Sequence, residues 1–138
     1  MPRLMAGYSG TPLAKKLGIK DGMRLTVLNA PDRYASWLRG LPPDARIVSK
    51  LARPAPAVHL FTKARRDLER TLPRLRDALE PAGFVWISWP KKSSGVATDV
   101  TEDSIRAVAL PLGFVDVKVC AVTDTWSGLK LVIRKSER

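Results

Sequence analysis

The sequence predicts one α/β domain, built on a six-stranded and mainly parallel sheet with helices on both faces. Apolar, strand-like runs alternate with helix-like segments along the chain, which is the order that β-α-β units require. The run at 84–89 is apolar at nearly every position, as expected of a strand that is covered on both faces. A chain of 138 residues is long enough to bury the core of one such domain, and we see no internal repeat or domain boundary in it.

The first predicted elements are a short helix and the strand that follows it. Residues 1–10 are small and glycine-bearing, and we expect them to be loosely held. Thr11-Pro12 is typical of a helix N-cap followed by proline in the first turn, and Gly18 is typical of a helix end. A turn then leads into a strand at 24–29.

The next two strands are predicted to be joined without a helix. A short helix at 32–39 precedes a strand at 45–49, and a third strand is expected at 57–62. Pro54 and Pro56 exclude a helix between these last two strands. The connection therefore crosses the sheet in extended form, and the domain is abbreviated.

The longest predicted helix covers residues 63–80. Four leucines at spacings of four, three and four form one apolar stripe, which indicates a helix that packs on the sheet. Pro73 lies inside this pattern and predicts a kink or a restart of the helix. The leucines of the stripe are Leu68, Leu72, Leu75 and Leu79.

The C-terminal part is predicted to be a helix followed by two strands. The helix at 102–110 has Asp99 or Thr101 as its N-cap and acidic residues in its first turn. The strands follow at 113–122 and 128–133, and the second returns antiparallel to its neighbours.

The chain is strongly basic, with a formal net charge of +11. Residues 1–80 carry a balance of +9, and residues 81–138 carry +2. Such an excess favours contact with nucleic acid, anionic surfaces or phosphorylated ligands. An arginine-rich surface without a binding role is the alternative, because neither a periodic basic face nor an aromatic platform accompanies the charge.

Composition favours a cytoplasmic protein. No apolar run approaches the roughly 20 residues of a membrane span, and no secretory signal is recognisable near Met1. Cys120 is the single cysteine, so the sequence permits no intrachain disulfide. Its strand-like setting predicts a buried thiol in a reducing compartment.

Residues 72–90 have a helix–turn–strand pattern that is similar to class I S-adenosylmethionine-dependent methyltransferases. The turn at Pro81-Ala82-Gly83 is placed like the proline–glycine turn of that family, and the helix and hairpin over 101–135 resemble its closing elements. The resemblance covers about 57–135. It implies a Rossmann-like sheet of order 2-1-3-4-6-5, as in a methyltransferase core that lacks one edge unit.

The sequence departs from this family at two places where the family holds its methyl donor. A Gly-x-Gly loop after the first strand is replaced by Ala30-Pro31-Asp32, although only glycine lets the backbone approach such a ligand closely. The acidic residue after the second strand would fall at Ser49-Lys50, and neither is a carboxylate. We therefore predict no cofactor, and the sequence disfavours S-adenosylmethionine.

The whole chain also resembles a bacterial family of unknown function. This resemblance spans nearly the full length, and it implies no activity. The segments that carry it lie at 7–19, 89–99, 115–122 and 126–130.

A ligand crevice is predicted at the carboxyl ends of the parallel strands, near the switch in strand order. Lys91-Lys92-Ser93-Ser94-Gly95 is the preferred anion site, because it joins positive charge, hydroxyl donors and a flexible glycine, although it lacks the Walker spacing. An ordinary solvated loop is the alternative, and Trp89 can either stack on a planar ligand or fill the core. The candidate ligand-binding residues are Asn29, Asp32, Lys63, Trp89, Lys91, Lys92, Ser93, Ser94, Thr98 and Asp99.

His59, the single histidine, is predicted to be a hydrogen-bonded core residue rather than a catalyst. It lies inside the predicted strand 57–62, between two apolar residues. A nucleophilic pair with Cys120 is disfavoured, because both residues lie within strands. One histidine and one cysteine also do not make a standard zinc site, so no metal is predicted.

Three functions remain open from the sequence. The leading hypothesis is a non-catalytic binding or regulatory module whose basic crevice holds an anionic ligand or partner. The second is nucleic-acid binding through the helix at 63–76, and the third is a divergent methyltransferase that uses Asn29 or Asp32 in an altered donor pocket. An exposed edge strand is compatible with a homodimer. The arginines of the nucleic-acid hypothesis are Arg65, Arg66, Arg70, Arg74 and Arg76.

Overall fold

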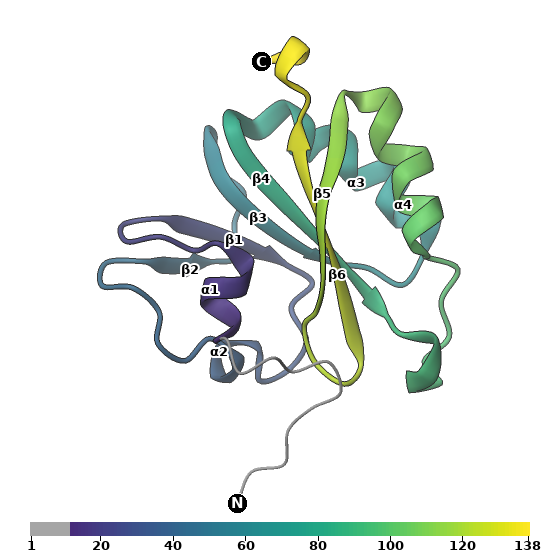
Figure 1. Ribbon diagram of the computed structural model, residues 1–138, viewed down its shortest axis with the longest axis horizontal. Coiled ribbons are helices and arrows are strands. Elements are labelled where there is room, and N and C mark those ends of the chain that lie inside the picture. The colour runs from purple at the N-terminus through teal and green to yellow at the C-terminus, as the bar shows by residue number, and fades with distance from the viewer. Residues whose placement is uncertain (1–11) are drawn as a thin grey trace, which may run out of the picture.

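A computed structural model describes residues 12–138 and contains one six-stranded sheet of order β2-β1-β3-β4-β6-β5 (Figure 1). The predicted fold class and strand order are confirmed. Strands β1 to β4 run parallel, and β6 is antiparallel to both β4 and β5. The strands are β1 (Arg24–Leu28), β2 (Arg46–Val48), β3 (Ala55–Phe61), β4 (Leu79–Pro90), β5 (Phe114–Ala121) and β6 (Trp126–Ile133).

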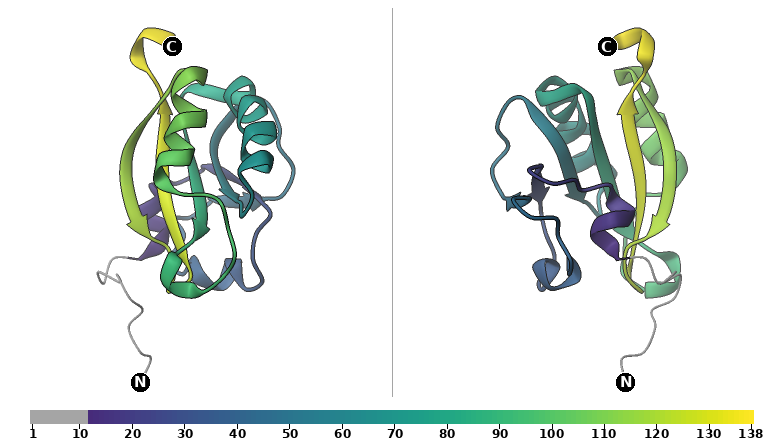
Figure 2. Two further views of the ribbon diagram at one scale, coloured as in Figure 1. Left: turned by 90° about the vertical axis from the view of Figure 1, so that its right-hand side faces the viewer. Right: turned by 60° about the vertical axis from the view of Figure 1, so that its left-hand side comes forward.

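Helices cover both faces of the sheet, as Figure 2 shows. The leucine stripe of α3 packs with α4 and with the apolar residues of β3, β4 and β6 on one face. On the other face, α1 and α2 bury Leu17 and Tyr34 against a second cluster that includes Trp86 and Trp126. The helices are α1 (Leu13–Leu17), α2 (Tyr34–Trp37), α3 (Arg65–Ala78) and α4 (Glu102–Ala109).

The N-terminal segment can be compared with the prediction only from Pro12 onward. Gly18 ends α1 at a φ of +83°, in the left-handed region that the predicted helix end requires. The predicted N-cap Thr11 and the expected loose segment 1–10 lie outside the described residues. Within 12–138, no helix has the length and apolar character needed to cross a bilayer.

The junction between α3 and β4 differs from the prediction. Helix α3 runs through Pro73 without a restart, and this proline lies on the exposed side between the buried Leu72 and Leu75. Strand β4 begins at Leu79, well before the predicted 84, and Leu79 pairs with Ala55. Sequence periodicity cannot show this extension, because the turn residues inside it read as a helix stop.

Gly83 makes this early part of β4 feasible. A Cβ at this position would lie 2.9 Å from both the Leu79 side chain and the Pro56 carbonyl oxygen. A larger residue would therefore push β4 away from β3. Beyond Gly83 the two strands pair in regular register from Ala57 with Phe84 onward.

Candidate functional site

The carboxyl ends of β1, β3 and β4 meet at one edge of the sheet, together with α2 and the loop that follows β4 (Figure 1). Ligands of open α/β sheets bind at such an edge. The polar candidates Asn29, Lys63 and Lys91 follow these three strand ends directly. The structure thus brings together, at one edge, segments that are far apart in the sequence.

The Asn29 side chain links the carboxyl ends of β1 and β3. Its backbone is left-handed, with a φ of +59°, and its side-chain Nδ2 donates to the Phe61 carbonyl oxygen at 3.2 Å. The side chain thereby bridges the two strand ends immediately before the Ala30-Pro31-Asp32 segment. Asp32 follows as an exposed residue, and α2 begins at Tyr34.

The loop after β4 is held by its own hydrogen bonds. Ser94 Oγ donates to the Lys91 carbonyl at 2.6 Å and accepts from the Val96 backbone N–H at 3.2 Å. The Lys91 N–H also donates to the Thr125 carbonyl at 2.7 Å, which ties the loop to the β5–β6 turn. Lys92 and Ser93 remain exposed on a short 3₁₀ turn, where they are accessible to an anion.

Thr98 and Asp99 hold the chain against the start of α3. Thr98 Oγ1 donates to the Lys63 carbonyl at 2.6 Å, and Asp99 Oδ1 accepts from the Arg65 backbone N–H at 2.7 Å. Asp99 is therefore the internal anion at the α3 N-terminus, a position that otherwise attracts phosphate or carboxylate ligands. Both side chains are engaged in the fold.

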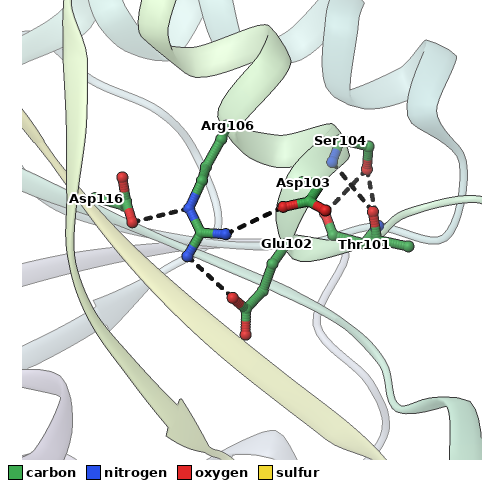
Figure 3. Close-up of polar contacts among 6 residues, drawn as sticks. All are labelled: Thr101, Glu102, Asp103, Ser104, Arg106 and Asp116. Carbon is green, nitrogen blue, oxygen red and sulfur yellow. Dashed lines mark hydrogen bonds and ion pairs between the residues drawn. The ribbon is translucent and has the colours of Figure 1, made fainter.

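The N-cap of α4 is Thr101 and not Asp99. Thr101 Oγ1 accepts from the Ser104 backbone N–H at 3.1 Å, and Ser104 Oγ accepts from the Thr101 N–H at 2.7 Å (Figure 3). This reciprocal arrangement is a capping box. Of the two alternatives that the sequence left open, the structure selects Thr101.

Trp89 lies away from the accessible part of the edge. Only 8% of its surface is exposed, and its ring packs in the core between the sheet and the α3–α4 layer. Trp86 lies on the opposite face with Trp126, as its odd spacing from Trp89 predicts. The structure thus favours the core role of Trp89 over ligand stacking.

His59 is a fully buried and fully hydrogen-bonded core residue, as predicted. Its Nδ1 lies 2.8 Å from the Tyr34 hydroxyl, and its Nε2 lies 2.8 Å from Ser88 Oγ. Burial lowers the pKa of His59 to about 3, so the imidazole is neutral at physiological pH. Burial also raises the pKa of Tyr34 above its usual value. Tyr34 and Ser88 come from distant segments, and no local sequence signal links them to His59.

Several of the α3 arginines have partners within the protein. Arg65 contacts Glu69 at 3.4 Å, and Arg70 contacts Asp67 at 2.6 Å. Arg76 Nε donates to the Leu112 carbonyl at 2.9 Å. The exposed residues Arg66 and Arg74 remain as the outward-facing positive charges of the proposed nucleic-acid helix.

A further ionic cluster joins α4 to the edge strand β5 (Figure 3). Arg106 Nε donates to Asp116 at 3.0 Å, and its other nitrogens contact Glu102 at 2.9 Å and Asp103 at 3.3 Å. The hydrogen bond from Arg106 lowers the pKa of Asp116, and the same bond raises the pKa of Arg106. The cluster is satisfied internally, so we assign it a structural role. Between Pro12 and Arg138 there is no group of three or more metal-ligating side chains.

Solved structures described as methyltransferases share this fold. The chain is similar to a putative type 11 methyltransferase from Sulfolobus solfataricus, with a TM-score of 0.65 and 14% identity over 91% of this chain and 92% of that one. It is also similar to an S-adenosylmethionine-dependent methyltransferase from Aquifex aeolicus, with a TM-score of 0.58 and 12% identity over 88% and 87% of the two chains.

A third similar structure is the fibrillarin of Aeropyrum pernix with natively bound S-adenosylmethionine. Its TM-score is 0.59, with 14% identity over 87% of this chain and 73% of that one. No protein-family model and no curated protein matches the chain. At these identities, the likeness concerns the fold alone.

Two places bear on the donor contacts that the methyltransferase resemblance implies. Asn29 places a hydrogen-bonded side chain between β1 and β3, just before the Ala30-Pro31-Asp32 segment. Ser49 and Lys50 follow β2 as exposed residues, and neither offers the carboxylate that a ribose would require. The chain therefore shares the fold of these methyltransferase structures, while its residues at both places differ from the glycine loop and the carboxylate that the resemblance implies.

Proposed function

We propose that the chain is a binding domain on a methyltransferase-like scaffold, and that it holds an anionic ligand at the carboxyl edge of the sheet. The observation that carries this proposal is the bridge from Asn29 to the Phe61 carbonyl, because it links the ends of β1 and β3 just before the segment Ala30-Pro31-Asp32 that replaces a donor loop. Lys63 and Lys92 are exposed beside this closed position and supply positive charge for a ligand that lies over the edge.

The loop after β4 supports the choice of an anion. It offers the ammonium group of Lys92, the hydroxyl of Ser93 and a backbone that turns through Gly95 at a φ of +76°. Hydroxyl, ammonium and turn N–H groups are the donors that commonly surround phosphate and carboxylate ligands. The internal hydrogen bonds of Ser94 hold this loop in shape before any ligand arrives.

A divergent methyltransferase is the second candidate, and the structural neighbours favour it. Proteins described as S-adenosylmethionine-dependent methyltransferases share the fold over nearly all of this chain. For this candidate, Asp32 and the Asn29 side-chain oxygen are the groups that would have to replace the missing carboxylate. Both stand at the β1 loop, which is the correct edge of the sheet.

Thermal unfolding with ligands separates the two candidates. We expect no stabilisation by S-adenosylmethionine or S-adenosylhomocysteine, and a rise in Tm with an anion such as ATP or inorganic phosphate. A ligand present at about one hundred times its Kd adds roughly 2.7 kcal/mol, which is a shift of several degrees in a domain of this size. A shift that only the adenosyl compounds produce would instead establish the methyltransferase candidate.

A charge-reversed variant locates the site. Lys91→Glu/Lys92→Glu should abolish the part of the anion-induced rise in Tm that arises from binding at the carboxyl edge, because it replaces both positive charges of the loop with negative ones. Arg134→Glu/Lys135→Glu is the matched control, since it makes the same change in net charge at exposed positions just after β6, at the opposite edge of the sheet. Equal losses in both variants would show that only the net charge matters.

A further inference from the structure

Two lysines stand directly opposite each other on the last two strands of the sheet. Lys118 on β5 pairs with Lys130 on β6, and both side chains lie on the α1 face. Like charges at directly opposed positions destabilise an antiparallel pair. An apolar or oppositely charged pair at these two positions would stabilise the sheet instead.

A β-bulge brings Lys118 to this face. The register of β5 on β6 shifts between Asp116 and Lys118, so that Asp116 pairs with Leu131 while Lys118 pairs with Lys130. Asp116 reaches Arg106 of α4 on the opposite face. In a regular strand Lys118 would lie on the same face as Asp116, two residues earlier, because side chains alternate along a strand. The bulge therefore redirects one lysine toward another.

Two more lysines join them from the α1 segment. Lys16 Nζ donates to the Ala121 carbonyl at 3.1 Å, and Lys118 Nζ lies 3.5 Å from the Lys16 carbonyl oxygen. Lys130 Nζ lies 4.5 Å from the centre of the Phe84 ring, and a Cβ on Gly18 would lie only 3.4 Å from it. Lys20 follows as an exposed residue just after α1. We call Lys16, Lys20, Lys118 and Lys130 the lysine cluster.

The lysine cluster is not neutralised by the protein. In the part of the chain from Pro12 to Arg138, no ion pair joins any of the four ammonium groups to a carboxylate. Burial lowers the pKa of Lys130, and the charges of Lys118 and Lys20 lower it further. Burial raises the pKa of Cys120, whereas the positive charges of Lys16, Lys118 and Lys91 act to lower it. The charges are thus close enough to repel one another.

The chemistry of the cluster favours phosphate over carboxylate. Although arginine is the commoner basic residue in this chain, the cluster contains only lysine. Arginine is suited to planar, bidentate recognition of carboxylates, whereas lysine acts as a point charge and is a common phosphate binder. Several ammonium groups over one strand pair match a compact ligand with several negative charges.

We propose that the lysine cluster is a second binding site, separate from the carboxyl edge, for a chain of phosphate groups such as a nucleoside triphosphate or inorganic polyphosphate carries. The ligand offsets the repulsion between Lys118 and Lys130 that the bulge in β5 creates. A role in capping α1 accounts for Lys118, which reaches the Lys16 carbonyl, but it does not account for Lys20 or Lys130.

Binding of inorganic tripolyphosphate by isothermal titration tests the proposal. We expect Lys118→Gln/Lys130→Gln to weaken binding about tenfold or more, because each lost ammonium–phosphate contact is worth a charged hydrogen bond. Lys50→Gln/Lys135→Gln removes the same charge elsewhere and should leave the affinity within about twofold. Lys91→Gln/Lys92→Gln should also retain tripolyphosphate binding, which distinguishes the lysine cluster from the proposed anion site at the carboxyl edge.

The stability of the free protein gives an independent readout. Lys118→Gln/Lys130→Gln should raise the Tm without ligand, since it removes a repulsive pair, and should lose the Tm increase that tripolyphosphate causes in the wild type. If ATP and tripolyphosphate bind with equal affinity, the phosphate chain is the recognised group. If ATP binds more tightly than tripolyphosphate, the protein also contacts the nucleoside. Absence of tripolyphosphate binding, equal binding of AMP and ATP, or equal losses in the Lys50/Lys135 control would each overturn the proposal.

Discussion

His59 Nε2 lies 2.8 Å from Ser88 Oγ in the fully buried layer between α2 and the sheet. The Tyr34 hydroxyl occupies the other ring nitrogen at the same distance. A neutral imidazole has one donor and one acceptor nitrogen, so two hydroxyl partners satisfy it completely. The two hydrogen bonds of His59 thus connect α2 to β3 and β4 at the centre of the sheet.

This arrangement predicts a pH-dependent stability with a defined sign. The unfolded chain protonates His59 near its ordinary pKa of 6.5, whereas the folded protein does so only near pH 3. The unfolded state therefore binds more protons between these values, and the free energy of unfolding falls as the pH is lowered through this range. We expect a loss of about 2 kcal/mol between pH 7 and pH 5, measured by urea unfolding.

His59 is the single histidine, which makes the measurement clean. His59→Gln should flatten the stability profile between pH 7 and pH 5, even though the variant itself is less stable. A variant profile as steep as that of the wild type would show that another group titrates in this range.

Asp99 should contribute to stability through α3 and not through α4. Asp99→Ala removes the carboxylate that accepts from the Arg65 N–H, and we expect a loss of about 1 kcal/mol in chemical denaturation. Asp99→Asn keeps a side-chain acceptor and should lose less. Asp103 is nearly fully exposed, so Asp103→Ala serves as the control and should change stability little. Equal effects at Asp99 and Asp103 would contradict the capping role.

Gly83→Ala should destabilise the start of β4. The added Cβ would meet the Leu79 side chain and the Pro56 carbonyl at 2.9 Å, and relief requires a backbone shift. We expect a cost of about 1–3 kcal/mol, the usual range for overpacking. Urea unfolding measures the loss, and hydrogen exchange should place the loosened amides in β3 and β4. A neutral substitution would mean that β4 adapts locally without cost.

The α3 arginines provide a test of the nucleic-acid hypothesis. Arg65, Arg70 and Arg76 already have partners, so Arg66 and Arg74 would have to carry an interface on α3. Since we propose that anions bind at the carboxyl edge instead, we expect Arg66→Gln/Arg74→Gln to leave the salt dependence of oligonucleotide binding unchanged. Affinities measured between low and moderate salt give the slope, which falls by roughly one for each lost phosphate contact. A slope reduced by about two in the variant would assign the interface to α3 after all.

Local patterns predicted most elements of the scaffold, and the resemblance to methyltransferases implied the order of its strands. The leucine stripe from Leu68 onward predicts α3 because a helix repeats every 3.6 residues, and the apolar run at 84–89 predicts the buried part of β4 because both of its faces are covered. The predicted order of six strands, including the antiparallel last strand, is the order observed.

Contacts between distant segments account for what the sequence did not predict. Asp99 caps a helix that begins 34 residues earlier, and its local neighbours suggested α4 instead. The partners of His59 lie 25 and 29 residues away along the chain. The lysine cluster depends on a bulge at Val117, and a one-residue change in pairing register leaves no trace in strand periodicity.

The bulge in β5 also bears on how the domain meets other chains. β5 is an outer strand of the sheet, and Val117 and Val119 are about half exposed on it. A regular strand could otherwise add to such an edge and start sheet-to-sheet growth. The extra residue interrupts the row of outward-facing N–H and C=O groups and increases the local twist, while Lys118 adds charge beside it. One inserted residue thus both gathers the lysines and makes the exposed margin of the sheet a poor template for aggregation.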